Sequence, residues 1–212
     1  MATIELHTWG TPNGRKVSIM LEECGLAYSV HKVDISKGEQ FKPEFLKISP
    51  NNKIPAIVDH DGPGGKPIAV FESAAILLYL AQKMKSPLLP TDPRAFITVT
   101  EWLFFQMASV GPMFGQMNHF VKFAPEKIQY GIDRYTNESK RILGVMEKQI
   151  GEHGYLAGAD YSIADVAAYP WVVSAQSIID LAGFPAVAGW LQKIGDRPAV
   201  QRGMKVPVLA KK

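Results

Sequence analysis

The stretch TPNG, residues 11–14, could position reactive groups, because it forms a turn between a short apolar segment and a helix-like run. The side chains of Thr11 and Asn13 and the free amides of the following helix could converge on one sulfur or oxygen anion. A thiol held there would ionise more easily, since helix N-termini lower thiol pKa values. The turn itself contains no Cys, Ser or Tyr. Thr and Asn are also common in purely structural turns, where Gly14 would permit unusual φ values.

A second candidate is Lys53-Ile54-Pro55, where an apolar residue precedes a proline at the start of an expected strand. A trans proline marking the first residue of the strand is the more common arrangement. A cis bond would instead turn the N–H and C=O of Ile54 outward, free to pair with an extended peptide ligand. Spacing along the sequence does not choose between these alternatives.

A third candidate is Glu72-Ser73, which opens an apolar helix. As a structural helix start, Ser73 would be the cap and Glu72 a favourable charge near the positive end of the helix dipole. As a binding site, the free amides would hold a ligand carboxylate while Glu72 accepts from a ligand ammonium. An amino-acid-like head group satisfies both halves, and the two interpretations are compatible.

Other motifs indicate less chemistry. GPGGKP lacks the GK[ST] ending of a phosphate loop, and the five histidines show no metal-ligand spacing, so no metal site is expected. Cys24 lies on the apolar side of its helix, as an inert core residue would. Arg134 could pair with Glu138, four residues further along a helix.

The composition bounds the class of protein. Of the 212 residues 47% are apolar and 20% charged, the net charge is +3, and there is one cysteine. These values are typical of a globular protein in a reducing, cytosolic setting and argue against a dedicated nucleic-acid surface. The longest apolar run, residues 74–81, is too short to span a membrane, and the start MATIELHT does not resemble a signal peptide.

The first part of the chain predicts a small α/β domain. Residues 4–8 alternate as a strand, residues 17–24 recur at helical spacing with Gly25 at the expected C-cap, and residues 28–35 are β-rich. After the polar loop SKGEQFKPEF, strands at 56–59 and 68–71 form a hairpin, and a buried helix covers 72–84. The order is β-α-β followed by β-β-α.

The remainder predicts helices only. A proline-rich segment, KSPLLPTDP at 85–93, separates a domain at 1–84 from an all-helical domain at 94–212. Asp92 or Thr91 could cap a long helix with a kink at Gly111-Pro112. A stripe of apolar residues over 128–150 indicates a second long helix, and Ser162 to Asp165 has the pattern of a capping box that opens a third.

These pieces, in this order, resemble a cytosolic glutathione transferase over nearly the whole chain. NNKIPAIVD and FESAAILLYL match the thioredoxin-like half, and DYSIADVAAYPW matches the folding signature of the helical half. TPNGRKV, KGEQFKPEFLKISPNNKIPAIVDH, WLFFQMASVGPMFGQMNHF and YGIDRY are most similar to the bacterial nu class, glutathione-dependent disulfide-bond oxidoreductases. The resemblance implies a cis-proline at Pro55 and glutathione as co-substrate.

Carried over by motif, the resemblance also implies roles for individual residues. The thiol of glutathione would be activated by Thr11 and Asn13, where other classes have Tyr, Ser or Cys. Other contacts with glutathione would come from Gln40, Lys53, Ile54, Pro55, Glu72, Ser73 and Arg134.

The expected function is reduction of disulfides by bound glutathione, without a catalytic protein cysteine. Conjugation of electrophiles or reduction of organic hydroperoxides is one alternative. For these an apolar pocket could come from Trp9, Trp102, Phe105, Met113, Phe114 and Phe120, although core packing explains most of these residues equally well. A non-enzymatic glutathione-binding module is another alternative. Residues 96–123 carry more large apolar side chains than one helix face can bury against its own chain, so a homodimer with this helix at the interface is expected. The expected location is the cytoplasm.

Overall fold

The computed structural model describes residues 3–208 and separates into two compact units. The first unit comprises the residues up to Ser86 together with those from Arg197 onward, and the second comprises Pro87–Asp196. The division expected from the sequence, 1–84, 85–93 and 94–212, stays a prediction, and its outer limits lie outside the described residues. The predicted fold class, a thioredoxin-like α/β part and an all-helical part, is confirmed.

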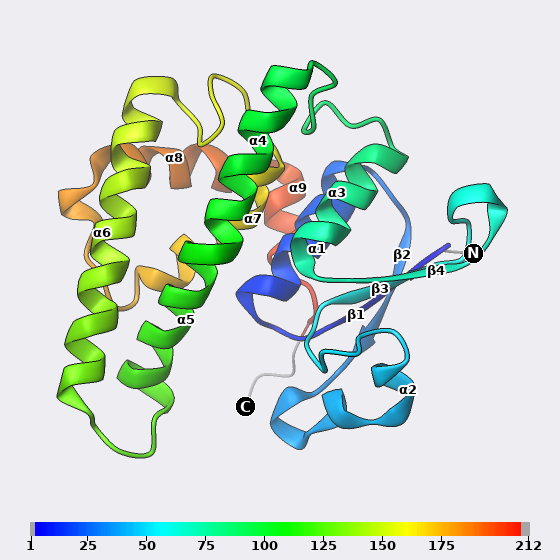
Figure 1. The fold of residues 1–212 in the computed structure, drawn as a ribbon, viewed down its shortest axis with the longest axis horizontal. Helices are drawn as coiled ribbons and strands as arrows, with labels where there is room; N and C mark the ends of the chain where they lie inside the picture. Colours follow the sequence, from blue (N-terminus) through cyan, green and yellow to red (C-terminus); the bar gives the residue numbers. More distant parts are fainter. Residues whose placement is uncertain (1–2, 209–212) are drawn as a thin grey trace. The chain divides into compact units, whose positions relative to one another are not determined.

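The first unit contains a four-stranded mixed sheet in the order β2-β1-β3-β4 (Figure 1). β1 pairs in parallel with β2 and antiparallel with β3, and β3 pairs antiparallel with β4. The elements follow the predicted β-α-β, β-β-α order: β1 Ile4–Thr8, α1 Pro12–Glu23, β2 Tyr28–Lys32, β3 Ala56–Asp59, β4 Ile68–Phe71 and α3 Ser73–Lys83.

Alternation along β1 decides which face of the sheet is covered. Ile4, Leu6 and Thr8 are fully buried, whereas Glu5 and His7 between them are half-buried. α1 ends as predicted, since Gly25 follows the last turn with φ of 63°, a left-handed conformation in which glycine carries no steric cost.

The segment between β2 and β3 is more ordered than the sequence predicts. β2 stops at Lys32, earlier than the expected end at residue 35. The expected polar loop contains single 3-10 turns at Ile35–Lys37 and Glu39–Phe41 and one helical turn, α2 Pro43–Leu46. Phe45 of α2 packs with Val33 and Ala56 in a small core cluster.

A short helix near the end of the described chain, α9 Pro198–Gly203, packs against α1. A Cβ atom added to Gly203 would lie 2.5 Å from Cα of Ile19, so only glycine fits at this contact. Ser18 Oγ donates a 2.7 Å hydrogen bond to the carbonyl of Gly203, and Arg197 binds Glu23 through two hydrogen bonds. The sequence did not predict this helix.

The second unit is helical throughout. Its helices are α4 Pro93–Phe105, α5 Gly111–Asn118, α6 Gln129–His153, α7 Ile163–Ala175 and α8 Pro185–Gly195. Of the two predicted caps for α4, the structure has Asp92. Its Oδ1 accepts a hydrogen bond from the amide of Ala95. Where a kink was predicted at Gly111-Pro112, π-helical geometry occupies Gln106–Val110, directly before Gly111.

The predicted capping box at the start of α7 is confirmed. Ser162 Oγ accepts from the amide of Ala164, and the carboxylate of Asp165 accepts from the amide and hydroxyl of Ser162. Asp165 is fully buried and also accepts from the amide of Leu156 and from Nε1 of Trp190.

Within residues 3–208, none of the helices combines the length and the apolar character that crossing a bilayer requires.

Candidate functional site

The register of the sheet brings the three candidate stretches to one edge. β1 runs toward this edge and ends at Thr8, which pairs with Lys32 at the end of β2. β3 begins there with Ala56, which pairs with Phe71 at the end of β4. Thr11, Ile54-Pro55 and Glu72-Ser73 each lie within three residues of these strand ends. The N-termini of α1 and α3 and the first residue of β3 therefore lie at this edge.

Thr11 is the N-cap of α1. Its Oγ1 accepts a 3.3 Å hydrogen bond from the amide of Gly14, which uses one lone pair of the hydroxyl and leaves its proton available to a ligand. Asn13 lies in the first turn of α1 and is half-buried. Gly14 does not adopt a positive φ, contrary to the expectation for this turn. It is needed because an added Cβ would lie 2.4 Å from the carbonyl oxygen of Trp9.

The start of α3 differs from the expected Ser73 cap. Glu72 occupies the N-cap position and Ser73 is the first helical residue. Glu72 has φ of 68° and ψ of 115°, a conformation that costs a non-glycine residue about 1–3 kcal/mol. Its exposed side chain forms no capping hydrogen bond and, within the described chain, no ion pair. The carboxylate of Glu72 is therefore exposed beside the N-terminus of α3.

Lys16, which is not among the residues expected from the sequence, lies behind this start. Its side chain is 1% exposed, and Nζ donates a 3.2 Å hydrogen bond to Oγ of Ser73. Burial lowers the pKa of Lys16 to about 7, against a smaller opposing effect of the nearby Glu72 carboxylate. The available signal was its spacing, because Lys16 lies four residues before Met20 on the buried face of α1.

The Ile54–Pro55 peptide bond is cis, as the resemblance implied. The side chain of Ile54 packs against the cluster of Val33, Phe45 and Ala56. Among residues 3–208, we find no hydrogen bond to the N–H or C=O of Ile54. The side chain of Lys53 is exposed, and its carbonyl accepts a hydrogen bond from Ser49.

Gln40 lies in the 3-10 turn Glu39–Phe41, on the segment that leaves the same sheet edge after β2. Its Oε1 atom is buried and has no hydrogen-bond partner in the described part of the chain. A buried acceptor without a donor costs free energy, which a ligand donor would recover.

Cys24 lies at the other end of α1 from Thr11. It forms the C-cap of this helix of 12 residues, so the two helix ends are about 18 Å apart. Burial raises the pKa of its thiol, a larger effect than the opposing hydrogen bond with Ser86. A thiol with a raised pKa is a poor nucleophile at neutral pH.

Arg134 belongs to the second unit, where it lies exposed on α6. Its expected partner, Glu138, instead binds Arg141 through two hydrogen bonds of 2.8 and 2.7 Å. Arg134 lines a cavity of about 730 Å³ within this unit, together with Met113, Tyr130, Asp133 and Arg141. Most of these lining side chains are polar or charged.

The aromatic residues considered for an apolar pocket have mainly packing roles. Phe114 is fully buried, Phe120 stacks on Tyr135 at 5.4 Å, and Trp102 contacts Phe105 edge to face. Of the six candidates, Met113 alone lines the cavity of the second unit.

Comparison with known proteins places the chain in a family. Residues 11–83 match the family model described as "Glutathione S-transferase, N-terminal domain", and residues 129–193 match "Glutathione S-transferase, C-terminal domain". The chain is 48% identical to the disulfide-bond oxidoreductase YfcG of Escherichia coli K12, over 95% of this chain and 94% of that protein.

Solved structures agree with this assignment. A glutathione transferase from Burkholderia graminis, with two glutathione molecules bound per subunit, superposes with a TM-score of 0.93 at 44% identity, covering 99% of this chain and 90% of the other. A glutathione transferase from Pseudomonas putida, with one glutathione disulfide bound per subunit, gives 0.91 at 46% identity over 97% and 92%. The chain therefore belongs to the glutathione S-transferase family.

Proposed function

We propose that this protein is a glutathione-dependent disulfide-bond reductase of the nu class, in which bound glutathione supplies the thiols. The observation that carries the proposal is the common sheet edge, because Thr11, Ile54 and Glu72 each lie within three residues of a strand end there. Within residues 3–208, the backbone of Ile54 has no hydrogen bond and Glu72 caps nothing. The relatives support it, since one is named a disulfide-bond oxidoreductase and others were crystallised with glutathione or its disulfide.

In the proposed complex, the γ-glutamyl end of glutathione binds at the start of α3. Its carboxylate accepts from the helix amides and from Ser73, and its ammonium donates to the carboxylate of Glu72. Lys16 is a positioning residue in this arrangement, because it holds Oγ of Ser73 from behind. The strained conformation of Glu72 fits such a role, since strain of this kind is found at ligand clamps.

The cysteinyl part would pair with the backbone N–H and C=O of Ile54 next to Pro55, which brings its sulfur toward the α1 N-terminus. Gln40, Lys53 and Arg134 are proposed as further contacts. The Gln40 contact would lower the free energy of the complex, because a glutathione donor would satisfy the buried, unpaired Oε1. Thr11 Oγ1 and Asn13 would stabilise the thiolate. The hydroxyl of Thr11 suits this task, since it caps the helix as an acceptor and still donates.

The proposed chemistry consists of two thiol–disulfide exchanges. The glutathione thiolate attacks a substrate disulfide, RSSR, giving the mixed disulfide GSSR and releasing RS⁻. A second glutathione thiolate attacks the glutathione sulfur of GSSR, giving GSSG and the second RS⁻. Two glutathiones are oxidised and one disulfide is reduced. Thiolate fraction and alignment of the sulfurs set the rate, so the protein needs only to lower the thiol pKa and orient both partners.

An activity panel tests the proposal. The panel compares a small mixed disulfide, an organic hydroperoxide and an aromatic chloro-dinitro electrophile at the same glutathione concentration. We expect the disulfide to turn over fastest. Cys24→Ala should keep this activity within about twofold, because the thiol lies at the far end of α1 with a raised pKa.

Two outcomes would contradict the proposal. Loss of most disulfide turnover in Cys24→Ala would mean that the protein thiol reacts. No turnover on any of the three substrates, despite retention on glutathione resin, would favour a binding module instead.

We further propose a cytoplasmic homodimer in which α4 lies at the interface. Ile97 and Phe104, seven residues apart on one face of α4, are 56% and 61% exposed, and an apolar face of this kind is typical of a subunit contact.

The cytoplasm is proposed because it supplies reduced glutathione. Light scattering at micromolar concentration checks the dimer, and cell fractionation checks the location.

A further inference from the structure

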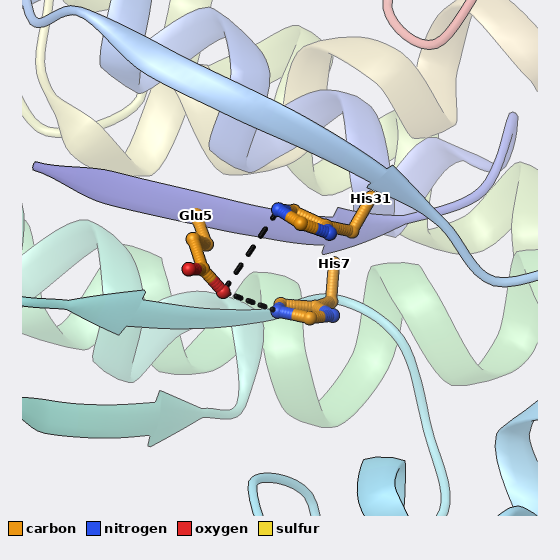
Figure 2. Close-up of side chains that lie close together, drawn as sticks. All are labelled: Glu5, His7 and His31. Carbon is orange, nitrogen blue, oxygen red and sulfur yellow. Dashed lines mark hydrogen bonds and ion pairs between the residues drawn. The ribbon is translucent and has the colours of Figure 1, made fainter. Parts of the chain in front are cut away.

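A second group of reactive side chains lies away from the sheet edge described above. Glu5 and His7 of β1 and His31 of β2 direct their side chains toward one another from neighbouring strands (Figure 2). Nε2 of His7 lies 3.3 Å from Oε2 of Glu5, and Nε2 of His31 lies 3.8 Å from the same oxygen. One potential ligand atom from each residue falls within 4.8 Å of the others.

The parallel register of the two strands creates this group. His7 pairs directly with His31, so their imidazoles stand side by side on one face of the sheet, stacked at 4.7 Å between ring centroids. Glu5 is two residues before His7 and therefore lies on the same face. Spacing along the sequence shows none of this, because β2 follows β1 through a crossover helix.

The separations are close to those of a tetrahedral metal centre. Zinc bonds of about 2.0–2.2 Å to nitrogen and oxygen, at tetrahedral angles, put two ligand atoms about 3.3–3.6 Å apart. The two distances to Oε2 of Glu5, 3.3 and 3.8 Å, lie close to this range. The two imidazoles, stacked at an interplanar angle of 17°, would have to rotate so that both nitrogens point at one ion. Two histidines and one carboxylate also form a known zinc ligand set that leaves a fourth position open.

The surroundings support a metal in two further ways. His60 Nε2 lies 2.8 Å from the other oxygen of Glu5, so it can orient the carboxylate as an outer-shell partner does. A cavity of about 240 Å³, lined by His7, His31 and Phe45 among others, adjoins the two imidazoles and leaves room for a solvent ligand.

We propose that Glu5, His7 and His31 form a binding site for a divalent transition metal ion, with zinc as the best match. The site is independent of the proposed glutathione chemistry, because it uses none of the residues assigned to that chemistry. Zinc suits the mixed nitrogen and oxygen donors and tolerates three protein ligands with an open position.

Calorimetric titration of the tag-free, metal-stripped protein with zinc chloride tests the proposal. The buffer contains no glutathione, because a free thiol would itself bind zinc. We expect one zinc per chain in the wild type. Binding should weaken by more than about 100-fold in Glu5→Gln and in His31→Asn, each of which removes a ligand, and by about 10- to 100-fold in His60→Asn, which removes an outer-shell partner.

His31→Asn is the safer ligand variant, since the side chain of His31 is 46% exposed and its loss disturbs the fold least. His153→Asn is the matched control, because His153 lies on α6 in the other unit, and it should bind zinc like the wild type. A second readout is the thermal midpoint, which zinc should raise in the wild type and in His153→Asn but not in His31→Asn.

Absence of zinc binding by the wild type at micromolar concentration would overturn the proposal. Equal zinc binding by the wild type and by folded His31→Asn would also overturn the proposal, because the metal would then be bound by other residues.

Discussion

The helices α7 and α3 begin in opposite ways, although each has an acidic residue in or next to its first turn. At α7 the carboxylate of Asp165 is fully buried and accepts from four donors supplied by Leu156, Ser162 and Trp190. At α3 the carboxylate of Glu72 is exposed, caps nothing and sits on a strained backbone. The first start is satisfied by the protein itself, whereas the second leaves the charge of Glu72 exposed to a ligand.

The difference indicates where stability and binding are located. A closed network such as that of Asp165 holds the fold and offers no group to a ligand. An open start such as that of Glu72 costs stability, and Lys16 adds to the cost because a cation near a helix N-terminus opposes the dipole. We expect mutations at the two starts to separate these effects.

The largest expected effect is that of Asp165→Ala. The substitution leaves the amides of Leu156 and Ser162 and the indole N–H of Trp190 buried without an acceptor, and should lower the free energy of unfolding by about 3–5 kcal/mol. Urea denaturation measures the loss. The glutathione affinity of the fraction that remains folded should not change. A loss of affinity in that fraction would contradict the proposal that the start of α7 contributes to stability and not to binding.

Lys16→Met should change how stability depends on pH. The folded pKa of Lys16 is about 7, below the ordinary lysine value, so the unfolded chain binds one more proton between these two values. Stability of the wild type therefore rises over this window, by about 2–4 kcal/mol from pH 7 to 10, relative to Lys16→Met. Denaturation at several pH values measures the slope.

Lys37→Met is the control for this slope, because the side chain of Lys37 is 76% exposed. Its removal should leave the pH dependence as in the wild type. If the unfolding free energy of Lys16→Met depends on pH as in the wild type, the pKa of the Lys16 amine is not lowered by burial.

Glu72→Gly should stabilise the fold and weaken binding at once. Glycine tolerates φ of 68° and is accepted at N-caps, so the free energy of unfolding should rise by about 1–2 kcal/mol. Loss of the carboxylate should weaken glutathione binding about 10- to 100-fold.

Glu72→Gln separates the two causes, since it keeps the strained backbone and removes the charge. We expect weaker binding without the gain in stability. Calorimetry and thermal unfolding of the same samples give both values, and unchanged affinity in both variants would remove Glu72 from the proposed site.

The smallest effect is expected at the start of α1, which is intermediate between the other two. Thr11→Ala removes the acceptor for the amide of Gly14 and should cost about 1 kcal/mol, whereas Thr11→Ser should retain the cap. The same pair tests whether the hydroxyl stabilises the thiolate, because Ser should also preserve the pKa of bound glutathione, read from the thiolate absorbance against pH.

Periodicity predicted most of the fold. The strands Ile4–Thr8, Ala56–Asp59 and Ile68–Phe71 occur with the predicted bounds, because turns rich in Gly, Pro and polar residues delimit them. The single turns at 35–46 were expected as a loop, since one turn is too short to show a period. α9 was not predicted, since a few residues after Pro198 carry little pattern and its position depends on a close contact with α1.

The candidate site was predictable as motifs but not as an arrangement. Local patterns pointed to Thr11 and Glu72, whereas their common edge depends on strand register, which the motifs do not contain. Lys16 was missed because a lysine on a helix is usually solvated, and its burial arises from packing against the start of α3. The spacing of His7 and His31 along the sequence does not show that they are neighbours, because the parallel pairing of β1 and β2 brings them together.

The contact between Gly203 and α1 has a consequence for the order of folding. The helical unit is inserted between two segments of the first unit, and the second segment supplies α9, which covers α1. On the ribosome, the face of α1 that packs against α9 therefore stays uncovered until residues 197–203 have been synthesised, after the whole helical unit. The part of the chain that is synthesised first is completed last, and a fragment ending at Ser86 would expose Ile19 and Ser18 to the solvent.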